Sequence, residues 1–181
     1  MQLLISLIIC MFLLSIIYMD FKENAVQLFL FCGLFLLNIA YATLSRDLSI
    51  MMKQVFTNSV IILSIVLLLF VYYSIKEKSF RKFFNQKLGV GDIVFWISIA
   101  PLFSTFNYIL FFIGSMLMVL LIVLTLRLIK EEVGFIPLAG YQSLFLLVIM
   151  LLNIFLINHT LPVDIFHFHP AVAAIESAGL E

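Results

Sequence analysis

The chain has 181 residues, of which 65% are hydrophobic and only 11% are charged, and its mean hydropathy is +1.24. Soluble domains are roughly half apolar and about a quarter charged, so this composition excludes an ordinary water-soluble globule. Its 20 phenylalanines and long aliphatic runs also exclude a disordered chain. Ten basic side chains balance ten acidic ones, which leaves no basic surface to bind nucleic acid. The composition therefore predicts an all-α protein embedded in a lipid bilayer.

Stretches free of Asp, Glu, Lys and Arg mark the candidate spans, because a charge at the bilayer centre is costly and a span needs about 20 apolar residues. These stretches are residues 1–19, 24–45, 54–75, 93–126 and 133–163, the last with its apolar centre at 138–158. As one helix, 93–126 would be about 51 Å long, far beyond a hydrocarbon core of about 30 Å. The run PLFSTFN, residues 101–107, places a proline and polar residues in its middle, which predicts a break and six spans in all.

Lys and Arg are unevenly divided between the two sides of a six-span chain. One side carries eight of them, and the other carries only Arg46 and Lys53. The eight are Lys22, Lys76, Lys78, Arg81, Lys82, Lys87, Arg127 and Lys130. Basic residues favour the cytoplasm, so we expect both termini outside and the 76–91 loop inside. Five spans would weaken the division to six against four, so the charges favour six.

We expect one membrane domain over residues 1–158, followed by a tail, 159–181, that is flexible or a cloning remnant. The uncharged start lacks the basic region of a signal peptide and is expected to remain as the first span. His159, His167 and His169 lie in the tail without a third ligand or an enclosing shell, so no metal site is expected. Neither Cys10 nor Cys32 belongs to a CxxC pair, and no cofactor is indicated.

Two of the four aspartates are expected at one face of the membrane. Asp20 ends the first span and Asp92 begins the fourth, whereas Asp47 and Asp164 fall in loops on the opposite side. Ionisable residues at a membrane edge are candidates for function. Two carboxyl groups can together hydrolyse a peptide bond, one activating a water and the other, protonated, binding the scissile carbonyl. Each residue also has a plain structural interpretation: Asp92 as a helix N-cap, and Asp20 as a solvated boundary residue paired with Lys22.

Asp92 stands in the sequence GVGD, after Gly89 and Gly91. Two glycines let a loop turn sharply and let another backbone approach closely. They would deliver the aspartate to the first turn of a membrane helix. Because a helix N-terminus favours negative charge and a C-terminus disfavours it, we assign Asp92 as the base and Asp20 as the acid, as a hypothesis.

At these residues the chain resembles the type IV prepilin peptidases, membrane aspartic proteases whose hallmark is GxGD. Asp92, Gly89 and Gly91 match that motif. In FIPLAGY, residues 135–141, Pro137 matches the first proline of a motif that opens the family's final span, while Gly140 departs from the second proline.

The family's first aspartate ends an early span and is followed by a basic residue and a short I-P-N-like element. Asp20, Lys22 and Val26 match that pattern in DFKENAVQL, while Gln27 and Leu28 depart from its proline and asparagine. The resemblance covers roughly residues 1–158 in spacing and polarity. We therefore consider Lys22, Gly89, Gly91 and Pro137 as supporting or substrate-binding residues beside the two aspartates.

The resemblance implies an aspartic endopeptidase that cuts the leader from prepilin-like membrane proteins at the cytoplasmic face of a prokaryotic inner membrane. Its partners would be that substrate and the lipid bilayer. The chain lacks the cysteine pairs of the larger family members, so it looks like the peptidase-only form without methyltransferase activity.

Two rival interpretations keep the same residues without peptidase activity. One is a small transporter or a subunit of a secretion or pilus assembly machine, with Asp20 and Asp92 as topology or ion-path residues. It predicts acidic groups deeper in the spans, or paired broken helices. The other keeps the peptidase fold but assumes that activity has been lost, because of the departures at Gln27, Leu28 and Gly140.

Overall fold

The computed structural model describes residues 1–23, 26–77, 89–129 and 137–156. The described elements are α1 (Gln2–Glu23), α2 (Leu28–Thr43), α3 (Leu48–Glu77), α5 (Val90–Ile99), the short 3₁₀ helix η1 (Ala100–Leu102), α6 (Thr105–Ile129) and α7 (Leu138–Leu156). The described part of the chain contains no strand, which confirms the all-α fold class. The predicted tail, with its three histidines, lies outside these residues.

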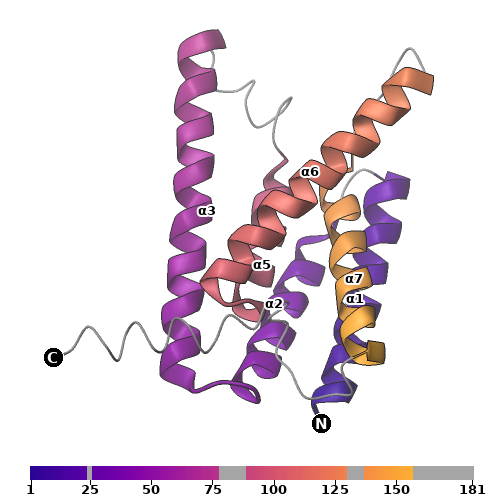
Figure 1. The fold of residues 1–181 in the computed structure, drawn as a ribbon. Coiled ribbons are helices and arrows are strands. Elements are labelled where there is room, and N and C mark those ends of the chain that lie inside the picture. Colours follow the sequence, from indigo (N-terminus) through magenta and orange to yellow (C-terminus); the bar gives the residue numbers. More distant parts are fainter. Residues whose placement is uncertain (24–25, 78–88, 130–136, 157–181) are drawn as a thin grey trace, which may run out of the picture.

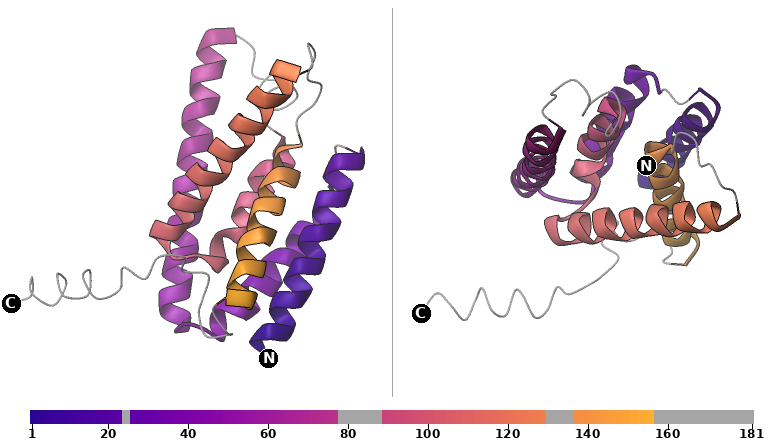
Figure 2. Two further views of the ribbon diagram at one scale, coloured as in Figure 1. Left: turned by 45° about the vertical axis from the view of Figure 1, so that its right-hand side comes forward. Right: turned by 90° about the horizontal axis from the view of Figure 1, so that it is seen from above.

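Successive helices run in alternating directions, so the ends of α1, α3 and α6 lie with the starts of α2, α5 and α7 (Figures 1 and 2). We call this the upper end, as it is drawn in Figure 1. The last turns of α1, α3 and α6 bring Lys22, Lys76 and Arg127 to it. Arg46 and Lys53 lie at the opposite end, around the α2–α3 connection.

Four helices, α1, α3, α6 and α7, are long and apolar enough to cross a membrane. The helix α2 and the segment Val90–Leu102 are also apolar but shorter. Many large apolar side chains on the outside of the bundle are exposed, including Leu68, Ile75 and Phe155. In water such a surface would be unstable, whereas lipid tails solvate it. The protein is therefore an all-α membrane protein.

The break predicted inside residues 93–126 lies at η1, which contains Pro101. Its two arms are unequal, since α5 has 10 residues and α6 has 25. A break exposes backbone carbonyls that lipid cannot satisfy. The amide of Asn58 donates to the carbonyls of Ala100 at 3.0 Å and Phe103 at 3.2 Å, and Asn38 donates to Ser98 at 2.8 Å. The two asparagines, on α3 and α2, thus stabilise the break.

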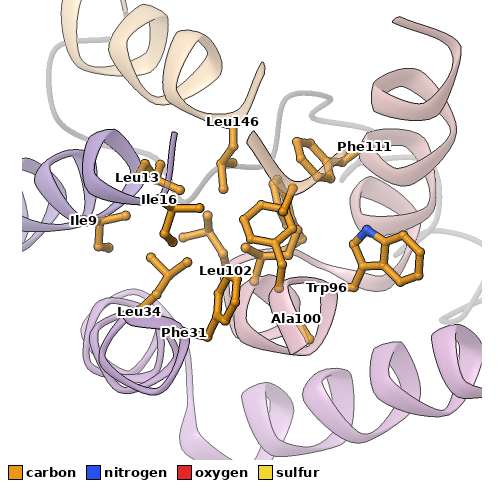
Figure 3. Close-up of a cluster of buried hydrophobic side chains, with 14 of the residues drawn as sticks. Ile9, Leu13, Ile16, Phe31, Leu34, Trp96, Ala100, Leu102, Phe111 and Leu146 are labelled. Atoms are coloured by element: carbon orange, nitrogen blue, oxygen red, sulfur yellow. The ribbon is translucent and has the colours of Figure 1, made fainter. Parts of the chain in front are cut away.

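A single apolar core joins α1, α2, α5, α6 and α7 (Figure 3). Leu13 and Ile16 of α1 face Leu146 of α7, and Phe31 of α2 lies beside the short helix α5 (Figure 3). Of all the helix pairs described, α1 and α7 pack most extensively. This core fixes the upper ends of α1, α5 and α7 relative to one another.

A buried hydrogen-bond chain links the same helices through Gln142 of α7. Its side-chain oxygen accepts a hydrogen bond from the Trp96 indole at 2.7 Å, and its amide nitrogen donates to the Ser115 hydroxyl at 3.3 Å. The Tyr108 hydroxyl of α6 donates to the Trp96 carbonyl at 2.8 Å. Since Gln142 is completely buried, both ends of its amide depend on these partners.

Replacing Gln142 with leucine is expected to lower the free energy of unfolding by about 1–2 kcal/mol, because it leaves the Trp96 N–H buried without an acceptor. Thermal unfolding of the purified protein in detergent measures the change. Gln27→Leu is the matched control, since Gln27 is exposed and makes no capping hydrogen bond. Adding Trp96→Phe to Gln142→Leu should recover part of the loss. An unchanged midpoint for Gln142→Leu would contradict the structural role of the amide.

Candidate functional site

Asp20 lies in the last turn of α1, with its side chain turned into the bundle. The residue is only 6% exposed, although it is three residues from the end of the helix. Its Oδ2 atom accepts a hydrogen bond from the backbone N–H of Gly140 at 2.5 Å. Asp20 is therefore held against α7 and is not a solvated boundary residue.

Asp92 is the third residue of α5, and Gly89 is the N-cap. The Asp92 N–H donates to the Gly89 carbonyl at 3.1 Å, and its carboxylate accepts a hydrogen bond from the Gly89 backbone. An acidic residue at this third position commonly reaches back to the N-cap N–H in this way. The interpretation of Asp92 as the N-cap is thus wrong. The N-cap is Gly89, three residues earlier, and Asp92 caps the helix from its third position.

The two aspartates meet at the first turn of α7. Asp20 accepts a hydrogen bond from the backbone of Gly140, and Asp92 accepts one from the backbone of Ala139. The first N–H groups of a helix have no carbonyl partner within it, and the first helical bond here runs from Tyr141 N–H to the Pro137 carbonyl. Two consecutive free N–H groups of α7 therefore bind one carboxylate each, and the two carboxylates are close enough to repel electrostatically.

The N-terminus of α7 adds a positive partial charge beside both aspartates, and this favours negative charge on the pair. The assignment of Asp92 as base and Asp20 as acid rests on the dipole of the helix that carries each residue. Because α7 faces both carboxylates, it does not distinguish them, and the assignment stays a prediction. What the fold does establish is a carboxylate pair on a helix N-terminus, in which Asp20 is buried and Asp92 is partly buried.

The two glycines of GVGD have different surroundings. A Cβ atom added at Gly89 would lie 3.0 Å from Oδ2 of Asp92, so the missing side chain lets that carboxylate fold back on the N-cap. A Cβ atom at Gly91 would lie 3.8 Å from the Phe31 ring, which is ordinary van der Waals contact. Packing therefore requires glycine at 89 but not at 91.

Gly140 is a site residue that the sequence did not single out, since it stands where the resemblance predicts the family's second proline. It gives its N–H to Asp20, and a proline there has no N–H to give. A Cβ atom at Gly140 would lie 2.9 Å from the Phe21 ring and 3.1 Å from Oδ2 of Asp20. The Phe21 ring also packs edge-on against Tyr141, with centroids 4.9 Å apart. The small pair Ala-Gly shortly after Pro137, at the start of an apolar run, was the available signal.

Lys22 and Pro137 lie near the pair without contacting either carboxylate in the described structure. The Lys22 ammonium donates to the Tyr18 hydroxyl at 2.9 Å, so its pairing with Asp20 is not seen. Pro137 directly precedes α7 and accepts that helix's first hydrogen bond. Pro137 therefore sets where the free N–H groups begin, and Lys22 is available to a partner outside the bundle.

Within the described ranges, no three His, Cys, Asp or Glu side chains come together as a metal-binding group. In comparisons with known proteins, no family model, no curated protein and no solved structure matches this chain. The chemistry of the site is therefore argued from the carboxylate pair alone.

Proposed function

We propose that this protein is a membrane aspartic endopeptidase that removes the leader from prepilin-like substrates. The observation that carries the proposal is the meeting of Asp20 and Asp92 at Ala139 and Gly140, although more than 40 residues of chain separate each aspartate from these two positions. Holding two carboxylates side by side and away from bulk water is costly, so such a pair is typical of acid–base catalysis. The match of Asp92 to GxGD and of Asp20 to the family's first aspartate supports the substrate class.

In the proposed reaction, Asp92 takes a proton from a water molecule while the water oxygen attacks the carbonyl carbon of the scissile peptide. Asp20, protonated, donates its proton to the carbonyl oxygen, which gives a neutral tetrahedral diol. The diol then collapses: its C–N bond breaks, the leaving nitrogen takes the proton held by Asp92, and one diol hydroxyl gives its proton to Asp20 as the carboxylic acid product forms. The proton count of the pair is restored after each turnover.

The location of the pair supports cleavage at a membrane edge. Asp20 and Asp92 lie at the upper end of the bundle, where the last turns of α1, α3 and α6 carry Lys22, Lys76 and Arg127. Basic residues favour the cytoplasmic side, so the proposed site faces the cytoplasm of a prokaryotic cell. A prepilin-like substrate presents its leader there, just before its hydrophobic helix.

The rival transporter interpretation predicts acidic groups deeper in the spans. Every acidic residue that the structure describes lies at or near a helix end: Asp20, Glu23, Asp47, Glu77 and Asp92. Only one broken helix, at η1, occurs among the described elements, and its carbonyls are bound by asparagine amides. These observations favour the peptidase over an ion path.

The proposal is tested by co-expressing the full chain with a panel of prepilin-like substrates and measuring their mass. We expect at least one substrate to become shorter by its basic leader, with a single new N-terminus directly before the hydrophobic segment. Cells without the chain provide the control. If every substrate of the panel keeps its leader while the protein is present in the membrane fraction, the proposed function is contradicted.

A further inference from the structure

Ser143 lies one helical turn below the carboxylate pair, on the same face of α7. It follows Ala139 by four residues and Gly140 by three, and these spacings stack side chains on one face of a helix. Side chains on a helix also lean toward its N-terminus, and Oδ2 of Asp20 lies 3.1 Å from the position of a Cβ atom at Gly140, so Asp20 lies on the side of α7 toward which Ser143 leans. The residue is completely buried.

The Ser143 hydroxyl differs from those of most serines in this bundle, and among the described serines it shares its buried, unpartnered state with Ser74. Ser6, Ser15, Ser64 and Ser98 each donate to the carbonyl four residues earlier in their own helix. Ser143 makes no such bond, and its Oγ atom has no hydrogen-bond partner among the described residues. Leaving a buried hydroxyl unpaired is costly, and in native proteins such groups are usually bound by ordered water.

The spacing also suits a water molecule. Ser143 makes no direct hydrogen bond to either carboxylate, and the rise of about 4.5–6 Å over three to four helical residues is one that a single bridging water can span. A buried water needs two to four polar partners. Ser143, Asp20 and Asp92 supply three.

We propose that Ser143 is a positioning residue of the carboxylate site, and that its hydroxyl binds one buried water together with Asp20 and Asp92. The water site rests on the burial of Ser143, on its unpartnered hydroxyl and on its position in α7. Its part in cleavage rests on the proposed function, where this water lies within reach of the base that would activate it.

A pH titration of the carboxylate pair also depends on the other titratable side chains on the helices that pack against α7. Helices α1, α5 and α6 pack against α7, and of these α1 and α5 bring Asp20 and Asp92 to its first turn. Lys22 is hydrogen-bonded to Tyr18, and Arg127 is exposed at the end of α6. The further titratable residues that the structure describes on the three helices are Cys10, Glu23 and Tyr108.

The test compares wild type with Ser143→Ala in nanodiscs by two measurements. The first is the pH titration of the carboxyl infrared band that disappears in Asp20→Asn. The second is kcat and KM for a synthetic prepilin-like peptide with a basic leader and an apolar helix. We expect Ser143→Ala to shift the carboxyl titration and to lower kcat about tenfold, with KM unchanged, because the water loses one of its three partners.

Ser98→Ala is the matched control, since Ser98 is also buried but donates to Val94 within its own helix. Ser143→Cys, which keeps a weak donor, should recover part of the activity. Removing an unpaired hydroxyl should not lower the thermal stability of Ser143→Ala. If Ser143→Ala has the wild-type titration and kinetics, the inference is overturned. If the titration shifts but wild type does not cut the peptide, the water site stands and the proposed function fails.

Discussion

Asp20→Asn and Asp92→Asn are each expected to reduce substrate processing by about 10²–10⁴-fold, the usual contribution of a general acid or base. An amide has nearly the shape of a carboxyl group and still accepts a hydrogen bond from a backbone N–H. Asparagine can therefore keep the contacts with Gly140 or Ala139, but it cannot take up and return a proton.

The same substitutions should leave the fold intact, which separates chemistry from structure. Each removes one of two carboxylates that repel each other at the first turn of α7, so neither should lower the thermal stability of the membrane-inserted protein. The control is Asp47→Asn, because Asp47 is exposed before α3 at the opposite end and asparagine serves equally well there as an N-cap. Processing by the Asp20→Asn and Asp92→Asn proteins at the wild-type rate would reduce the pair to a structural cap of α7.

Gly140→Ala is expected to reduce processing by about a hundredfold while the protein still inserts, because displacing a catalytic group by about 1 Å has effects of that order. The new Cβ atom would lie 2.9 Å from the Phe21 ring and 3.1 Å from Oδ2 of Asp20. Phe21 is 45% exposed and can move aside, whereas Asp20 is buried and would have to give by a few tenths of an ångström relative to Asp92.

Two further variants locate the cause of this loss. Gly114→Ala is the matched control on α6, where a Cβ atom would meet the Phe145 ring at an ordinary 3.9 Å. Combining Gly140→Ala with Phe21→Ala relieves the contact with the ring but not the one with the carboxylate, so activity should stay low. Full recovery in the double variant would place the effect in α1–α7 packing instead of in the position of Asp20.

The sequence by itself determined the membrane environment, the all-α fold class and the candidate aspartates. These follow from local properties: the length of charge-free runs, the proline at 101 and the spacing of GVGD. The helices, with their break at η1, begin and end within six residues of the predicted stretches wherever the structure describes both. Local sequence is sufficient there, since a backbone in lipid must satisfy its own hydrogen bonds and so forms helices.

Only the tertiary structure decided what the two aspartates contact. Asp20 and Asp92 are 72 residues apart, and the N–H groups that bind them belong to a third helix. Ala139, Gly140 and Ser143 carry no chemical signature in the sequence, because a backbone N–H or a lone hydroxyl acquires a role only through what lies opposite it. Here the groups opposite are the two carboxylates, which the packing of α1 and α5 brings to the start of α7. The close approach of α1 depends on the absence of a side chain at Gly140.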